Sequence, residues 1–317
     1  MQPLDLHQLK TEDLHTRPSK VMLADLGRPA AYHAALGAWF ESLPRQLAAN
    51  EIRRLRDEIC RCHLEQRTLV VAIGGHVIKT GCAPYLIDWI DRGLIRGLAM
   101  NGSAAIHDYE LALAGKTSED VASQLARGAF GMARQTAQAF ATASQNGAQT
   151  SAGLGRALGA LIAEQNCPHA DASLVYAAYR NNIPCTIHVA LGTDIVHMHP
   201  GISGAALGES SLLDFRILCQ LVMTMAEGLW LNIGSAVVMP EVFLKAIAVA
   251  RNFGADLAGL VTANLDKEAK YRTRMNVLSR PSAAGLEIIG HHEILIPLLH
   301  MAVMSQLSTI RTEQQAA

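Results

Sequence analysis

The sequence predicts an α/β protein with a doubly wound, mostly parallel, Rossmann-like sheet that follows an N-terminal helical segment. Short apolar runs, such as residues 68–73 and 229–233, alternate with longer segments that have helical spacing. These runs lack polar alternation, which is typical of strands buried on both faces of a parallel sheet. Small residues follow successive runs, and polar residues cluster there, as at the ligand-binding edge of such sheets.

Three parts are expected along the chain. Residues 1–66 carry apolar side chains at helical spacing and no evident chemistry, so we expect a helical cap or oligomer contact there. Pro44 is expected to kink or divide a helix in this part. Residues 67–310 form the expected catalytic domain, and residues 311–317 a tail.

The first repeated unit begins with the strand at 68–73. A glycine-containing loop at 74–81 and a helix at 82–92 follow, with Pro84 in the first turn of the helix. Such a loop lets backbone N–H groups approach an anion at a helix N-terminus. A tight structural turn would have the same sequence, so both interpretations stay open.

The second unit is a strand at 95–100, a small-residue turn and a helix that starts at Ala104. His107 and Glu110 are three residues apart on this helix and share one face, with Asp108 beside them. We interpret this group as a site at the end of the strand, although acids are also common in first turns of helices.

The middle of the chain is expected to be helical, with a loop or domain seam at 146–155. A strand at 185–190 then leads into a run with one aspartate and two histidines, Asp194, His197 and His199. In an extended segment the two histidines point to the same side. We expect the small-residue stretch 201–211 to be a loop that closes over a ligand.

Later units repeat the pattern. The strand at 229–233 ends in Gly234 and Ser235, and a strand at 257–262 delivers Asn264 and Asp266. The segment 271–280 is expected to be a loop with three arginines, which suit carboxylate or phosphate groups or form a solvated basic loop. An apolar C-terminal helix is expected at 294–307. The polar strand ends together predict one site on one edge of the sheet.

Composition narrows the function classes. The chain has 317 residues and a net charge of −1, with no basic block and 5% aromatic residues, which disfavours nucleic acid and acidic membranes as partners. Six scattered cysteines suggest reduced thiols. Neither a secretory leader nor an uncharged apolar stretch of ~18 residues is evident. We therefore expect a soluble, cytoplasmic protein with a small-molecule substrate.

The order of these motifs resembles that of deoxyhypusine synthase and its NAD-binding superfamily. Residues 74–81 stand where that family has its first glycine-containing loop, and residues 100–108 resemble its Thr-Thr-Ala-Gly-Gly-Val-Glu-Glu-Asp segment. Residues 173–176 and 190–194 are similar to its Ser-Val-Tyr-Tyr and Ala-Leu-Thr-Asp-Gly runs. The similarity covers about residues 67–300.

The resemblance implies NAD as cofactor and a homotetramer with sites at dimer interfaces. The family's catalytic lysine has no counterpart, because no lysine follows Lys270, so we do not expect a true deoxyhypusine synthase. The run from Asn101 to Glu110 also resembles the archaeal and cyanobacterial type of ornithine cyclodeaminase. Lys79 stands where that type has a histidine, and one more residue separates Asn101 from His107.

The leading hypothesis is an NAD-dependent enzyme that moves a hydride from a small polar substrate bearing an amine or hydroxyl, with or without a carboxylate or phosphate. Two alternatives stay open: a metal-dependent hydrolase or lyase using His188, His197, His199 and His291, and a non-catalytic NAD-binding regulator. The expected catalytic residues are Lys79, His107, Glu110, His197 and His199. The expected cofactor-binding residues are Gly74, Gly75, Thr80, Gly81, Asn101, Gly102, Asp194, Gly234 and Ser235. The expected substrate-binding residues are Asp108, Glu241, Arg272, Arg274, Arg280, His291 and His292.

Overall fold

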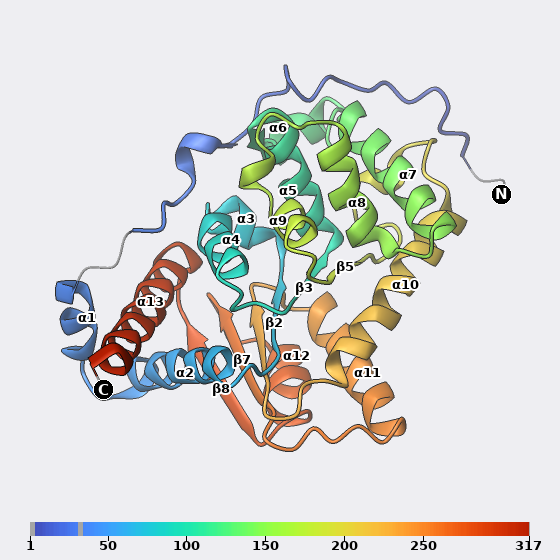
Figure 1. Ribbon diagram of the computed structural model, residues 1–317. Coiled ribbons are helices and arrows are strands. Elements are labelled where there is room, and N and C mark those ends of the chain that lie inside the picture. Colours follow the sequence, from blue (N-terminus) through green and yellow to red (C-terminus); the bar gives the residue numbers. More distant parts are fainter. Residues whose placement is uncertain (1–3, 31–33, 317) are drawn as a thin grey trace.

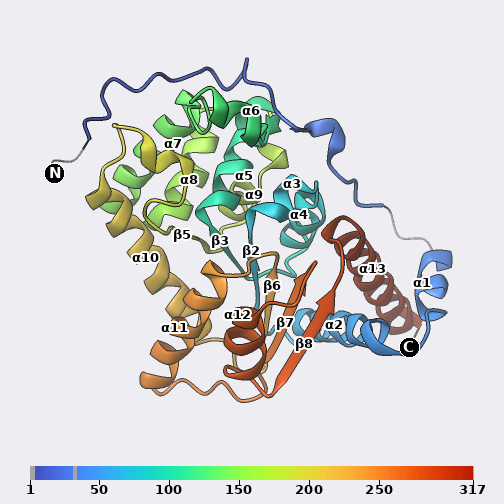
Figure 2. The same cartoon turned by 180° about the vertical axis from the view of Figure 1, so that it is seen from behind.

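A computed structural model describes residues 4–30 and 34–316 and confirms the predicted fold class (Figures 1 and 2). Six strands form one sheet in the order β5-β3-β2-β6-β7-β8, and every neighbouring pair is parallel. The strands are β2 (Leu69–Ile73), β3 (Gly97–Asn101), β5 (Cys185–His188), β6 (Leu229–Ile233), β7 (Val261–Asp266) and β8 (Ala284–Ile289).

Helices cover both faces of the sheet, as a doubly wound fold requires. One face packs on α2 (Leu47–Leu64), α4 (Ala83–Asp91), α5 (Gly102–Ala114), α8 (Gly153–Glu164), α9 (Leu174–Arg180) and α13 (His292–Ala316). The other face packs on α10 (Gly204–Val222), α11 (Val238–Asn252) and a π-helical turn (Arg274–Ser279).

Alternating side chains of the strands supply both cores. All five residues of β2 are buried; Val71 belongs to the first core and Val70 to the second. In the second core the rings of Trp230 and Phe243 stack with centroids 4.0 Å apart. Burying each large apolar side chain contributes roughly 1.5–3 kcal/mol, so these continuous runs account for the central strands.

Several predicted boundaries agree with the structure and others do not. Pro44 lies between α1 (Ala34–Glu41) and α2, so it divides the two helices. β7 begins four residues later than the predicted strand and extends through Asn264 and Asp266, which are buried within the strand rather than following its end. β8 was not predicted, because its sequence alternates between buried and half-exposed positions at the edge of the sheet.

Three predicted loops are wrong. The supposed seam at 146–155 is mostly the end of α7 (Arg134–Gln149) and the start of α8. The supposed lid at 201–211 is mostly α10, whose N-cap Ser203 accepts a hydrogen bond from the Ala206 amide. The arginine-containing segment forms α12 (Tyr271–Thr273) and the π-helical turn.

The C-terminal helix is longer than predicted, and α13 continues to Ala316. Its segment His292–Thr312 is long and apolar enough to cross a membrane by length and composition alone, which we had not expected. In this structure Leu299 and Val303 are buried in the first core, and the helix contacts α1, α2 and α4.

An N-terminal strap, defined here as residues 4–27, runs along the outside of α5, α6 (Val121–Ala126) and α7 (Figure 1). Within it β1 (Val21–Met22) pairs antiparallel with β4 (Lys116–Thr117). Leu14 of the strap is fully buried, and the Glu12 amide donates to the Met132 carbonyl at 2.9 Å. The strap is therefore part of the folded domain.

Candidate active site

The strand order places the ends of β2 and β6 at a topological switch point. From β2 the chain moves outward through β3 to β5, and it then returns to β6 and moves outward through β7 to β8 on the other side. In open parallel sheets, ligands bind outside the carboxyl ends of the strands near such a reversal. The candidate site is therefore sought at this edge.

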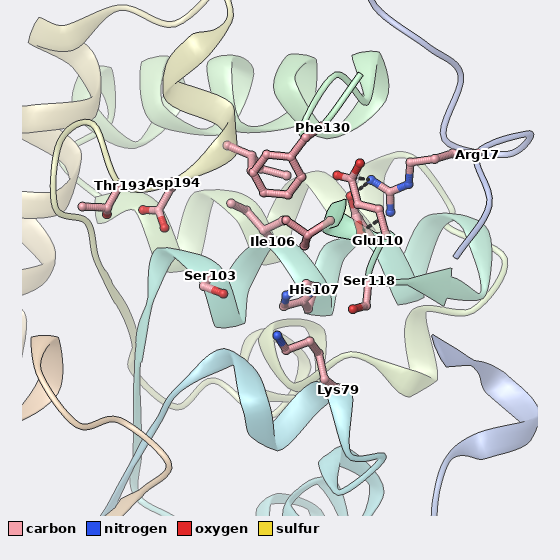
Figure 3. Close-up of a pocket in the computed structure, with 13 residues that line it drawn as sticks. Arg17, Lys79, Ser103, Ile106, His107, Glu110, Ser118, Phe130, Thr193 and Asp194 are labelled. Atoms are coloured by element: carbon pink, nitrogen blue, oxygen red, sulfur yellow. Dashed lines mark hydrogen bonds and ion pairs between the residues drawn. The ribbon is translucent and has the colours of Figure 1, made fainter. Parts of the chain in front are cut away.

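A cavity of about 210 Å³ opens beyond the carboxyl ends of β2, β3 and β5 (Figure 3). Figure 3 shows Thr193 and Asp194 at one side, Arg17 and Glu110 at the other, and Ile106 and Phe130 between them. Lys79, the last residue of the short helix α3 (Gly75–Lys79), points toward His107. The other lining residues are Ser103, Ser118, Glu119, Val121 and Ile195.

The size of the cavity limits what can fill it. Pockets for drug-sized ligands and cofactors usually measure roughly 300–1,000 Å³. At about 210 Å³ this cavity has room for a small molecule rather than a whole dinucleotide.

His107 has a defined tautomer because of its partner. Its Nδ1 lies 2.7 Å from the Thr117 hydroxyl, and that hydroxyl donates to Glu110 Oε2 at 2.6 Å. Since the hydroxyl proton is used, Nδ1–H must be the donor to Thr117, which leaves the lone pair on Nε2. The pKa of His107 is lowered to about 4, chiefly by burial; Glu110 opposes this shift, and the charges of Lys79 and Arg17 add to it. The ring is neutral, with Nε2 as an acceptor.

Local sequence accounts for this contact. Gly115 ends α5 in the left-handed conformation at φ 65°, which suits a residue without a Cβ. The chain then turns back as β4 and brings Thr117 against the helix face that carries His107 and Glu110.

Glu110 is saturated with hydrogen bonds. Arg17 binds both of its oxygens, at 3.0 and 2.8 Å, and Thr117 and Thr136 each donate to one of them. Side-chain exposure is 0% for Arg17 and 1% for Glu110. We had predicted a catalytic role for Glu110; four donors leave it as an orienting group rather than a proton acceptor.

Glu119 adds a second carboxylate beside Arg17. Its Oε1 lies 3.3 Å from Arg17 and accepts from the Gly131 amide, while its Oε2 is buried without a partner among the described residues. Burial raises the pKa of this carboxyl. One oxygen of a buried acid is thus left to a ligand of the cavity.

Asp194 lines the opposite side. Its carboxylate lies so close to the first turn of α5 that a Cβ on Gly102 would be 2.1 Å from Oδ2. Burial raises the pKa of Asp194 to about 6. A glycine is therefore needed at position 102, as predicted, but the reason is the close approach of the Asp194 carboxylate rather than that of a cofactor.

The two histidines of the same run do not line the cavity. Residues Ile195–Met198 form a 3-10 helix, so the extended geometry that we assumed is wrong. His197 Nδ1 accepts from the Gly192 and Asp194 amides, and its Nε2 is buried, unpaired within residues 4–30 and 34–316, and 3.9 Å from Asp194 Oδ2. His199 is buried against the Gly131 carbonyl at 2.8 Å.

Asp108 and His188 have structural surroundings. Asp108 is fully buried and accepts from the Ser173 hydroxyl and the Leu174 and Val175 amides, so it caps α9 rather than facing a substrate. His188 is buried in β5 beside the Thr186 hydroxyl. Across the described ranges, no three His, Cys, Asp or Glu side chains are grouped to hold a metal.

The predicted cofactor residues meet at the switch point. A Cβ on Gly74 would lie 2.2 Å from the Gly234 carbonyl oxygen, and Gly234 adopts φ 63° beside the His292 ring. His292 donates through Nε2 to the Leu265 carbonyl, and its buried Nδ1 has no partner in the described part of the chain.

The charges of Lys79 and Lys267 act at this point. Burial lowers the pKa of His76, whose ring lies 5.4 Å from that of His292, and the charges of His292, Lys79 and Lys267 lower it further. Bare glycine backbone and the charges of Lys79 and Lys267 together fit the phosphates of a dinucleotide.

Other predicted cofactor residues support the local fold. Asn101 caps α5 by accepting from the Ala104 amide, and Thr80 donates to the His76 carbonyl. Gly81 has φ 75° and packs on the Asp25 carbonyl of the strap. Ser235 accepts from the Met239 amide in the first turn of α11.

The predicted substrate arginines lie away from the cavity. Arg272 pairs with Glu241, which also pairs with Lys245, and Arg274 pairs with Glu287 of β8. Arg280 donates to Asn276 of the π-helical turn. His291 is exposed. The expected single site is thus two groups: a cavity beyond β2, β3 and β5, and a set of surface pairs beyond β6, β7 and β8.

Sequence reasoning missed Arg17, Thr117 and Glu119. Arg17 lies in a segment without periodicity, and its partner Glu110 is 93 residues away. A local signal existed for Thr117 alone, since Gly115 marks the end of a helix and predicts that the chain turns back.

Comparison with known proteins gives the fold. No protein-family model and no curated protein matches the chain. The structure of AgrE in ternary complex with ornithine and NAD+ is similar, with a TM-score of 0.54 and 16% identity over 82% of this chain and 33% of AgrE. Unliganded AgrE has a TM-score of 0.54 and 15% identity, over 84% of this chain and 34% of AgrE. ArgZ, an arginine dihydrolase from cyanobacteria, has a TM-score of 0.47 and 17% identity, over 81% of this chain and 32% of ArgZ.

The chain spans about a third of the length of these proteins. At this identity the likeness to AgrE establishes a shared fold, and it agrees with the fold that the sequence resemblance implied.

Proposed function

We propose that the protein is an NAD-dependent enzyme that removes a hydride from a small polar substrate bearing an amine, such as an amino acid. The observation that supports it best is the cavity beside the switch point, where a neutral histidine, a lysine and the carboxyl groups of Glu119 and Asp194 meet. The ternary complex of AgrE, which shares the fold, contains ornithine and NAD+.

The switch point would hold the cofactor. Gly74, Gly75 and Gly234 would allow the dinucleotide to approach the backbone, with His76 and His292 alongside. Bound NAD would supply the hydride acceptor for a C–H bond next to the amine.

The residues of the cavity would bind and orient the substrate. Asp194 and the free oxygen of Glu119 would take ammonium groups, and Lys79 would take a carboxylate. Ile106 and Phe130 would exclude water from the aliphatic part. His107 Nε2 would accept the amine proton as the C–H bond breaks, leaving an imine.

Two measurements test this function. NAD should raise the melting temperature of the protein, and a panel of amino acids and diamines should include one that gives NADH absorbance in a rapid-mixing experiment. A matched pair of variants locates the reaction: His107→Gln should abolish the absorbance change, and His291→Gln should leave it intact. Absence of any NAD-dependent stabilisation would overturn the proposal.

A further inference from the structure

The N-terminal strap contributes to the cavity from outside the sheet. Backbone bonds fix it on both sides of Arg17: the Glu12 amide donates to the Met132 carbonyl at 2.9 Å, and the Lys20 amide to the Ser118 carbonyl at 2.6 Å. Lys116 also donates to the Arg17 carbonyl at 2.9 Å. The strap thereby follows the turn that carries Thr117.

Attachment of the strap does not require that Arg17 be completely buried. Its guanidinium has no exposed surface, and it forms a two-pronged pair with Glu110 and a third contact with Glu119. A buried arginine is unfavourable without full pairing, yet its Nε has no partner among the described residues. An exposed pair on the same strap, Asp13 with Arg134 at 3.1 Å, would anchor the segment without this cost.

We propose that Arg17 is a positioning residue for His107, acting through Glu110 and Thr117. Arg17 holds both oxygens of Glu110 as an ionised acceptor, so the Thr117 hydroxyl donates to Glu110 and accepts from His107 Nδ1–H. The lone pair of Nε2 is thereby kept for the cavity. The inference rests on the proposed function, in which Nε2 accepts the substrate proton.

The charges that face His107 define what Arg17→Gln should change. They are Glu110 on its own helix, Lys79 on α3 and Arg17 on the strap. If Glu110 stays ionised without Arg17, the pKa of His107 rises, because an acid now faces it uncompensated. If Glu110 takes up a proton, it donates to Thr117, the Thr117 hydroxyl turns to His107, and the ring changes to the Nε2–H tautomer.

Nitrogen-15 NMR of the histidine rings in the full-length protein tests the relay, with His107→Gln to assign the signal. Wild type should show the Nδ1–H tautomer. Thr117→Ser should keep it, whereas Thr117→Val should give a mixture of tautomers. Arg17→Gln should shift either the tautomer or the pKa. Arg134→Gln, on the exposed pair, is the matched control and should leave the His107 signal unchanged.

The outcomes are distinguishable. A His107 signal that is the same in wild type and Thr117→Val would overturn the relay. This comparison tests the relay even if Arg17→Gln fails to fold. The spectrum needs neither cofactor nor substrate, so a tautomer that moves as expected in a protein without NAD binding would uphold the relay and reject the proposed function. With an active enzyme, Thr117→Val should lower kcat about tenfold, as expected for an orienting contact, with little change in KM.

Discussion

Both halves of the sheet edge carry charged residues, and the surroundings of these residues differ. Beyond β2, β3 and β5, Arg17, Glu110 and Glu119 are buried at a cavity, and Glu119 Oε2 lacks a partner among the described residues. Beyond β6, β7 and β8, Arg272 and Arg274 are exposed and paired with Glu241 and Glu287.

The difference teaches that charge in a sequence does not by itself identify a site. An exposed ion pair is solvated and contributes little. Removing an ionisable group from water disfavours its charged form and displaces its pKa, as for His107 at about 4 and Asp194 at about 6. Ionisable groups with displaced pKa values are frequent at functional sites. The first half of the edge is therefore the better candidate.

The largest expected effect is a difference in activity between a variant in the first half of the sheet edge and a variant in the second half. With the substrate found in the panel, His107→Gln should lower kcat by roughly 10²–10⁴-fold, since it removes the proton acceptor, while NAD still stabilises the protein. His291→Gln, on an exposed ring of the second half, should change kcat less than about twofold. Equal losses in the two variants would contradict the comparison.

An intermediate effect concerns stability and pH. Burial raises the pKa of Asp194 from its ordinary value to about 6, so ionisation of this carboxyl opposes folding. The contribution of the neutral form is present below about pH 4 and is lost as the pH rises through 6. Asp194→Asn should therefore be more stable than wild type at neutral pH, by at most about 2–3 kcal/mol, with no advantage below pH 4.

Urea denaturation from pH 4 to 8 measures this difference. Asp171→Asn is the control, because Asp171 is 90% exposed and should give no pH-dependent gain. A difference that grows as the pH falls would contradict the assignment.

The smallest expected effect lies in the second half. Arg272→Gln breaks a pair whose side chains are 53% and 38% exposed. The melting temperature should change by less than about 2 °C, because exposed pairs contribute little, and NAD binding should not change. A large loss of NAD binding would indicate instead that the arginines of the second half bind the cofactor phosphates.

The sequence predicted the parts of the fold that depend on local patterns. The apolar runs of β2 and β6 identified buried strands, and the small residues after them marked the edge of the sheet at which the site was predicted. Lys79, His107 and Asp194 were predicted as site residues because each follows a predicted strand.

The remaining site depended on contacts between distant segments. Nothing near Arg17 indicates that it meets Glu110, and nothing near Arg274 indicates that Glu287 neutralises it. Local sequence also cannot tell that Asp108 turns toward the amides of α9 while His107, one residue earlier, lines the cavity. Each of these assignments requires knowing which side chains face one another.

Hydrogen exchange of the full chain with and without NAD tests the central claim most directly. The account expects NAD to slow exchange at residues 74–81, 101–107 and 192–197 and at the turn after β6, with no change at residues 271–280. Protection confined to residues 271–280, or none at any of these segments, would contradict it.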